Sequence, residues 1–229
     1  MAETDIVIGF DLDGPLIDSF DAHWQVVNAV MAFYKKPALT KEELLLKTPL
    51  NYEGLYYNAG IRDNWEKTRA IYIPAFRKAI KENPPNLFSD VRETLCYLED
   101  MARLYLVTNN NQENVSFYDS YANFLNFFYE IIFVSGGASK YEFLKYIKNK
   151  ETFGGRVDKG FVFISDMPGD LIAAQEAGWL VYGIPRGYAS ERILKKAIKK
   201  GQGDIIKDLF ELRDMFLFEL PEDNYIELM

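Results

Sequence analysis

The stretch Ile6-Val7-Ile8-Gly9-Phe10-Asp11-Leu12-Asp13-Gly14-Pro15 decides the fold of this 229-residue chain. Residues 6–10 form a short apolar run rich in β-branched side chains, which is typical of a buried parallel strand. The run ends in two carboxylates, Asp11 and Asp13, followed by the turn-forming Gly14. Active sites of open α/β sheets lie beyond the carboxyl ends of the strands. The stretch therefore predicts a strand with a polar site at its end.

Further apolar runs downstream predict additional strands, each ending in small or polar residues. Segments with helical spacing lie between them, such as 91–101 and 171–177. A last short strand or turn over 204–209 precedes a helix to about Phe218. Strands that alternate with helices indicate an α/β fold with a mostly parallel sheet covered on both faces. The additional runs are residues 103–107, 130–134, 161–164 and 180–184.

Residues 18–83 interrupt this alternation, because they show helical periodicity and no strand run. Capping boxes at 40–43 and 63–66 predict helix starts inside the insertion. Pro84 and Pro85 end its last helix. We therefore expect a core of residues 1–17 and 84–229 and an all-helical insertion at 18–83.

Composition limits the classes of partner. The formal net charge is −8 and the pI about 4.9, so the overall field repels nucleic acid and anionic membranes. An anionic small substrate would need local positive charge. There is no export signal and no run approaching the ~18 apolar residues of a membrane span, so we expect a cytoplasmic protein.

The chain has one cysteine and one histidine. Cys96 excludes an internal disulfide, and its apolar neighbours predict a buried structural thiol. His23 alone cannot form a histidine-rich zinc site, and its helical context favours a helix-face residue over a catalyst.

Taken alone, Asp11 and its neighbours could equally form a solvent-exposed Asp-Gly turn with no function. Polar residues at the other predicted strand ends make an active site the better interpretation. Thr108 and Asn109 could hydrogen-bond phosphate oxygens. Lys140 could neutralise a phosphate and a carboxylate nucleophile. Asp166 and Asp170 bring two more acids to the same edge. Four aspartates with few cations beside them indicate Mg²⁺, which prefers hard oxygen ligands.

These motifs, DLDGP at 11–15, LVTNN at 106–110, Lys140 and SDMPGDLIAAQEAG at 165–178, resemble those of the haloacid dehalogenase superfamily. The order is the same, and the likeness covers essentially the whole chain. It is greatest to the branch of phosphoglycolate phosphatases and β-phosphoglucomutases. The resemblance implies a Rossmann-like core with a helical cap inserted after the first motif, which agrees with the insertion expected from periodicity.

The resemblance also implies roles for individual residues. Asp11 would be the nucleophile that forms an aspartyl-phosphate, and Asp13 the general acid and base. Magnesium would be held by Asp11, by Asp166 and by the backbone carbonyl of Asp13, with Asp170 in support. The phosphate binders would be Thr108, Asn109 and Lys140. We expect a magnesium-dependent phosphatase acting on a small phosphorylated metabolite, as a monomer or homodimer.

Three positions depart from the family pattern: Pro15 where threonine is common, Tyr141 where proline is frequent, and Ser165 where glycine is usual.

Three other functions are considered beside the phosphatase. Asp13 argues against a dehalogenase, which lacks the second acid. A phosphomutase would share every residue named. Pro15 and the aromatic content of 15% leave open a catalytically weak binding or regulatory relative.

Substrate choice is expected to lie in the cap. Residues 47–62 could close over the site, although packing within the cap explains their aromatic side chains equally well. The candidates are Lys47, Asn51, Tyr52, Tyr56, Tyr57 and Arg62.

Overall fold

A computed structural model describes residues 5–47, 52–134, 139–153 and 160–217 and has the expected α/β fold. Its sheet has six parallel strands in the order β3-β2-β1-β4-β5-β6. The central strand β1 pairs with β2 on one side and β4 on the other, so the chain switches direction across the sheet at the end of β1. Such a switch point opens a crevice. The strands are β1 (Ile6–Phe10), β2 (Arg103–Thr108), β3 (Glu130–Phe133), β4 (Gly160–Ser165), β5 (Leu180–Gly183) and β6 (Gly203–Ile205).

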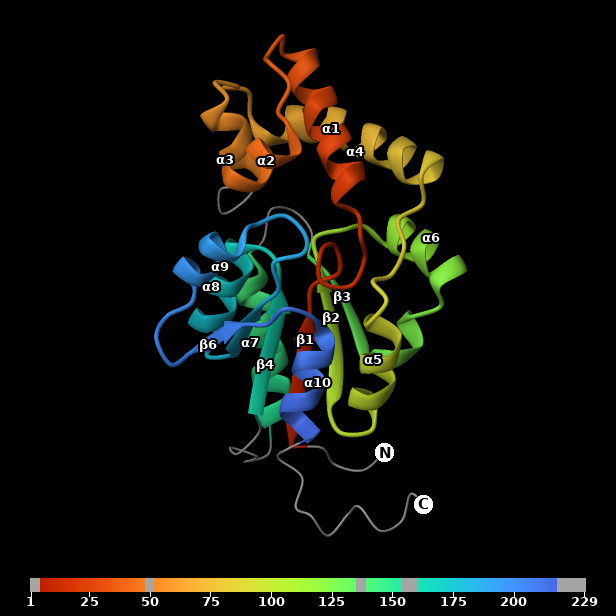
Figure 1. Ribbon diagram of the computed structural model, residues 1–229, viewed down its shortest axis with the longest axis vertical. Coiled ribbons are helices and arrows are strands. Elements are labelled where there is room, and N and C mark those ends of the chain that lie inside the picture. The colour runs from red at the N-terminus through yellow and green to blue at the C-terminus, as the bar shows by residue number, and fades with distance from the viewer. Residues whose placement is uncertain (1–4, 48–51, 135–138, 154–159, 218–229) are drawn as a thin grey trace.

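Helices cover both faces of the sheet (Figure 1). Alternate residues of β1 divide between two hydrophobic clusters, because strand side chains point to opposite faces. Ile8 and Phe10 pack with α5 (Val91–Glu99), α6 (Gln112–Ala122) and α10 (Leu209–Leu217). Val7 packs on the other face, with α7 (Lys140–Thr152), α8 (Pro168–Glu176) and α9 (Glu191–Ala197). A 3₁₀ turn, η1 (Leu125–Phe127), precedes β3.

The predicted insertion consists, in its described part, of four helices that stand over the carboxyl edge of the sheet (Figure 1). They have a hydrophobic cluster of their own, to which α1 contributes Val27 and Val30, and α3 contributes Leu55. At their base Val26 and Ile80 join the main core. The helices are α1 (Phe20–Phe33), α2 (Lys41–Lys47), α3 (Tyr52–Asn58) and α4 (Trp65–Glu82).

One predicted capping box forms and the other is displaced by a residue. The Thr40 and Glu43 side chains each accept a hydrogen bond from the other's backbone N–H, at 3.1 and 3.0 Å, and α2 begins between them. At the second, the Asn64 side chain, and not that of Asp63, caps α4 by accepting from the Lys67 N–H. Asparagine is an equally good N-cap residue, so sequence alone leaves a one-residue ambiguity there.

Cys96 was expected to be buried, and that prediction is wrong. Val91, Thr94, Leu95 and Leu98 form the buried face of α5, which leaves Cys96 exposed on the other side. The apolar run around Cys96 thus belongs to an amphipathic helix. No helix in the described part of the chain is long and apolar enough to cross a membrane.

Candidate active site

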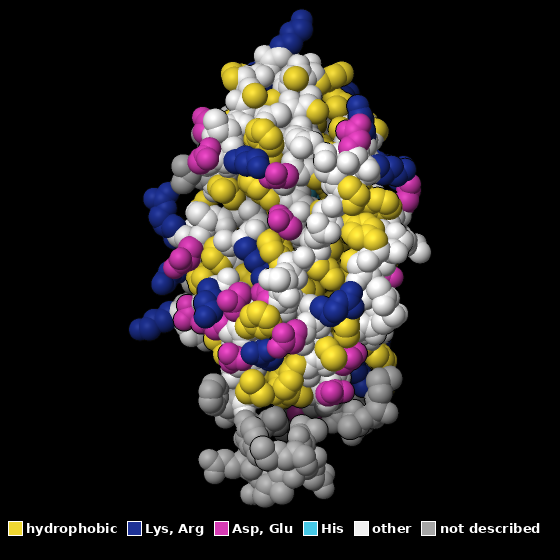
Figure 2. All heavy atoms as spheres, turned by 45° about the vertical axis from the view of Figure 1, so that its right-hand side comes forward, with side chains coloured by type: hydrophobic (Ala, Val, Ile, Leu, Met, Phe, Trp, Pro, Cys, Tyr) yellow, Lys and Arg dark blue, Asp and Glu magenta, His cyan; other side chains and the backbone are white. Residues whose placement is uncertain are grey.

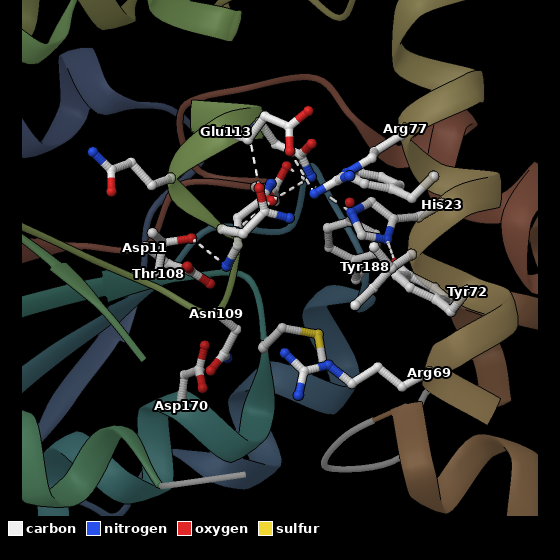
Figure 3. Close-up of a pocket in the computed structure, with 18 residues that line it drawn as sticks. Asp11, His23, Arg69, Tyr72, Arg77, Thr108, Asn109, Glu113, Asp170 and Tyr188 are labelled. Atoms are coloured by element: carbon white, nitrogen blue, oxygen red, sulfur yellow. Dashed lines mark hydrogen bonds and ion pairs between the residues drawn. The ribbon is translucent and has the colours of Figure 1, made fainter. Parts of the chain in front are cut away.

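A cavity of about 520 Å³ lies between the carboxyl edge of the sheet and helix α4 (Figure 3). Its core wall comes from the loops that follow β1, β2 and β4, and from Tyr188 after β5. Its cap wall comes from α1 and α4. The lining residues include Asp11, Asp13, Asn109, Asn110, Glu113 and Asp170 on the core side, and His23, Arg69, Tyr72, Ile73, Phe76 and Arg77 on the cap side.

Asp11 lies at the floor of the cavity, directly after β1. Its Oδ1 accepts a hydrogen bond from the Leu12 N–H at 2.8 Å and lies 2.7 Å from Lys140 Nζ. Burial raises the pKa of Asp11 to about 7, although the attraction of Lys140 works against this rise. The carboxylate is therefore poorly solvated, which favours nucleophilic reactivity once it is ionised.

Lys140 joins two acids of the core wall. Its Nζ lies 2.7 Å from Asp11 Oδ1 and 2.6 Å from Asp170 Oδ2, and its side chain is almost fully buried. Burial works to lower the pKa of Lys140, but the two carboxylates outweigh it and raise the pKa. The structure thus places a fixed positive charge beside Asp11.

Asp13 differs from Asp11 in its surroundings. Ser19 Oγ donates to Asp13 Oδ1 at 2.7 Å, and Asn110 Nδ2 donates to Asp13 Oδ2 at 2.8 Å. His23 Nε2 lies 3.9 Å from Asp13 Oδ1. Burial alone would raise the pKa of Asp13, but interactions with His23, Ser19 and Asn110 together lower it. Asp13 thus has more hydrogen-bond partners than Asp11, and two carboxylates in different environments can take different roles in one reaction.

His23 and Ser19 are site residues that sequence reasoning missed. His23 was interpreted as a helix-face residue, yet it is buried in the cavity wall, and its Nδ1 is hydrogen-bonded to the Tyr72 hydroxyl of α4. Ser19 Oγ also contacts the Tyr188 hydroxyl at 2.9 Å. The available signal was spacing: Ser19 lies six residues after Asp13 at the N-cap of α1, and His23 follows one helical turn later.

Thr108 and Asn109 lie at the end of β2, and both line the cavity. Thr108 is buried, and its Oγ1 accepts a hydrogen bond from the Asn110 N–H at 3.0 Å. Asn110 was not predicted as a site residue, but it connects Asp13 to Asn114, whose Nδ2 donates to Asn110 Oδ1 at 2.8 Å. The run of asparagines therefore holds Asp13 from the core side.

Asp166 is fully buried behind the cavity. Its Oδ2 accepts the Tyr188 N–H at 2.6 Å, whereas its Oδ1 has no hydrogen-bond partner among the described residues. Burial and the nearby charge of Asp11 raise its pKa well above the usual range. The backbone at Gly14, where φ is +101°, lies close to the Asp166 carboxylate. A Cβ added at Gly14 would be only 2.1 Å from Asp166 Oδ2, so the position requires glycine.

These features fit a divalent cation between Asp11 and Asp166. Burial makes both carboxylates costly to ionise, and the charge of Asp11 adds to that cost for Asp166. One oxygen of Asp166 has no hydrogen-bond partner among the described residues. In the described part of the chain, no three side chains from Asp, Glu, His and Cys form a metal cage by themselves. Magnesium commonly uses one or two carboxylates and keeps several waters, so this donor set suits it.

The three departures from the family pattern are accommodated locally. The Pro15 carbonyl accepts a hydrogen bond from Arg186. The Tyr141 N–H donates to the Ser139 side chain that caps α7, a bond that proline could not make. Ser165 Oγ accepts the Met167 N–H at 3.1 Å and contacts Asp170 Oδ2 at 3.3 Å.

The described cap candidates of the sequence analysis lie away from this cavity. Tyr56 is buried in the hydrophobic cluster of the cap. Tyr57 is exposed and stacks with Arg62, whose guanidinium carbon is 4.1 Å from the ring centroid. Asn51, like residues 135–138 before Lys140, falls outside the described residues, as do the side chains of Lys47 and Tyr52. Helix α4 supplies most of the cap wall instead.

Comparisons with known proteins bear on the family and the fold of the chain. A sequence model of the haloacid dehalogenase-like hydrolases matches residues 8–184. A haloacid dehalogenase-like hydrolase from Streptococcus pneumoniae is similar in structure, with a TM-score of 0.72 and 18% identity over 94% of this chain and 100% of the other. No curated protein matches by sequence.

Two further solved structures are similar to this chain. One is a predicted phosphoglycolate phosphatase from Haemophilus somnus, with a TM-score of 0.70 and 20% identity over 94% of this chain and 99% of the other. The second is a candidate β-phosphoglucomutase from Thermotoga maritima, with a TM-score of 0.63 and 20% identity over 93% and 99%. At these identities the likeness shows the fold.

Proposed function

Because the chain belongs to the haloacid dehalogenase-like hydrolase family, we propose that it is a magnesium-dependent phosphatase of small phosphate esters. One observation carries the proposal: Asp11, buried and 2.7 Å from Lys140, shares a cavity with Asp13, which Ser19 and Asn110 hold by hydrogen bonds. That arrangement supplies a nucleophile and a separate acid and base.

In the first step, an Asp11 oxygen attacks phosphorus as the bond from phosphorus to the leaving oxygen breaks. Asp13 gives its proton to the leaving alkoxide. In the second step Asp13 accepts a proton from a water molecule that attacks the aspartyl-phosphate, which releases inorganic phosphate and restores Asp11. A bound phosphate dianion favours the protonated form of Asp13 that the first step needs. Lys140, Thr108 and Asn109 bind the phosphoryl oxygens.

Asp11, Asp166 and the carbonyl of Asp13 would hold the magnesium ion, and Asp170 would support the site through Lys140. The ion would offset the repulsion between Asp11 and a phosphate dianion. Residues 18–83 would form the cap of a core made of residues 1–17 and 84–229. The face in Figure 2 has acidic and basic side chains interspersed, which suits a small-molecule substrate better than nucleic acid.

Hydrolysis of p-nitrophenyl phosphate with magnesium tests the proposal, using Asp11→Asn, Asp13→Asn and, as a matched control, Asp63→Asn on the exposed cap surface. We expect Asp11→Asn to lose at least ~10³-fold in kcat/KM, as when a nucleophile is removed. Asp13→Asn should lose less on this substrate, because p-nitrophenolate leaves without a proton from Asp13. The control should retain its activity. Equal activity in all four proteins would refute the role of Asp11, and equal activity with EDTA would refute the metal.

The same residues would serve a phosphomutase, and product analysis separates the two reactions. A phosphatase releases inorganic phosphate in an amount equal to the substrate consumed. A mutase returns the phosphoryl group to a second hydroxyl of a sugar phosphate. A chain that binds beryllium fluoride at Asp11 but turns over no ester would be a binding relative.

A further inference from the structure

Two arginines of α4 line the cap wall, and they differ in their partners. Arg77 Nη2 lies 2.5 Å from Glu113 Oε2 on the core helix α6. Arg69, eight residues earlier, is partly buried, and no residue in the described ranges forms a hydrogen bond or ion pair with it. Figure 3 shows Arg69 pointing from α4 into the cavity. The cavity therefore contains a guanidinium with open donors.

The surroundings of Arg69 make this positive charge available to a ligand. Its neighbours on the same wall, Tyr72, Ile73 and Phe76, present mainly apolar surface. Such a wall lowers the local dielectric and strengthens attraction to an anion. A guanidinium offers a planar fork that matches a carboxylate or phosphate in bidentate geometry.

The acids of the cavity are already engaged elsewhere. Asp11 and Asp170 share Lys140. Glu113 is paired with Arg77, and Asp13 accepts hydrogen bonds from Ser19 and Asn110. Consequently Arg69 is the cation of this lining that the described acids leave uncompensated. Its place on the cap wall, opposite Asp11, also separates it from the position of the transferred phosphoryl group.

We propose that Arg69 binds a second anionic group of the substrate, a carboxylate or a second phosphate at the end remote from the reacting ester. The inference rests on the proposed phosphatase function and narrows its substrate class to phosphate esters with two anionic ends. Such a molecule would reach from Lys140 on the core wall to Arg69 on the cap wall. Alkyl phosphates, whose remote end carries no charge, would occupy only the first of these positions.

Matched substrates test the proposal. One pair is 3-phosphoglycerate and glycerol 3-phosphate, and the other is propane-1,3-diol bisphosphate and its monophosphate. In at least one pair, we expect the wild type to prefer the substrate with two anionic ends by about tenfold or more in kcat/KM. The difference should lie chiefly in KM, because a charge-assisted bidentate contact strengthens binding. Arg69→Met should abolish the preference, whereas Lys78→Met, an exposed control on the same helix and outside the cavity lining, should keep the same ratio. The two pairs distinguish carboxylate from phosphate.

Each alternative outcome contradicts the proposal in a different way. If Arg69→Met lowers kcat/KM equally for both members of a pair, Arg69 binds the transferred phosphoryl group. If the wild type shows no preference, the second anionic position does not exist. If the wild type hydrolyses none of these substrates, the proposed phosphatase function is refuted, but the role of Arg69 in binding can still be tested. Calorimetric titration with propane-1,3-diol bisphosphate provides that test. Arg69 is then supported by tighter binding to the wild type than to Arg69→Met, and refuted by equal binding.

Discussion

The two walls of the cavity are built on different principles. On the core wall, charged and polar groups are joined to one another, as Lys140 joins Asp11 and Asp170, and Asn110 holds Asp13. On the cap wall, aromatic and aliphatic side chains surround arginines. One of them, Arg77, reaches across to the core, and the other points into the cavity.

The difference indicates a division of labour. A reaction step needs groups held in fixed positions with defined protonation, which an interconnected network provides. Selection among substrates needs contacts to the part of the molecule that does not react. We therefore expect substitutions on the core wall to lower the rate for every substrate, and substitutions on the cap wall to change the relative rates.

Replacing Lys140 should produce the largest effect, because it removes the cation at the centre of the core wall. We expect Lys140→Met to lower kcat/KM by ~10³-fold for all phosphate esters, since loss of a buried charge contact to the reacting group costs several kcal/mol. The substitution also leaves two buried carboxylates without their partner. Steady-state kinetics on several esters, with circular dichroism to verify folding, measure the effect.

Lys145→Met is the control, because Lys145 is exposed on the same helix. A folded Lys140→Met protein that loses activity on some esters and keeps it on others would place Lys140 in substrate selection. That result would break the proposed contrast between the walls.

Asn110→Ala should have the next largest effect and should depend on the leaving group. Asn110 holds one oxygen of Asp13, so its loss should misplace the proton donor. Alkyl leaving groups need that proton, whereas p-nitrophenolate leaves without it. We expect a decrease of ~10–100-fold for an alkyl phosphate and less than ~3-fold for p-nitrophenyl phosphate. Equal losses on both would mean that Asn110 acts on folding or binding instead.

Much of the core wall could be predicted from sequence, because each residue follows a strand and parallel strands end at one edge of the sheet. Asp11, Asp13, Thr108, Asn109, Lys140, Asp166 and Asp170 all lie at that edge or behind it. The cap wall could not. Which face of an inserted helix turns toward the core depends on packing between α1 and α4, and local periodicity does not encode that packing. His23 and Arg69 were missed for this reason.

Stability measurements should show the cost of holding Asp11 in the core wall. Its pKa in the folded protein, about 7, lies above the ordinary value of 3.8. The folded state therefore binds the proton more tightly, and stability falls as the pH rises between these values. In metal-free buffer at pH 8, where the cost is fully present, Asp11→Asn should stabilise the protein by ~1–2 kcal/mol.

Thermal unfolding in EDTA at pH 8 and at pH 4 checks this result. The stabilisation should shrink toward zero at pH 4, where Asp11 is largely protonated in the folded state. Asp63→Asn serves as the exposed control and should change little at either pH. A destabilising Asp11→Asn at pH 8 would show that the attraction to Lys140 outweighs burial.

The smallest effect is expected for the ion pair that links the two walls. Arg77 and Glu113 lie 2.5 Å apart, but their side chains are 42% and 58% exposed. Solvent screens such a pair, so a double-mutant cycle of Arg77→Met and Glu113→Gln should give a coupling energy below ~1 kcal/mol in unfolding. A similar coupling in KM, together with an unchanged kcat, would mean that the pair holds the cap against the core when substrate binds. Coupling in unfolding without coupling in KM would show that the Arg77–Glu113 pair is a structural contact only. In that case the substrate itself, and not this pair, would connect the two walls.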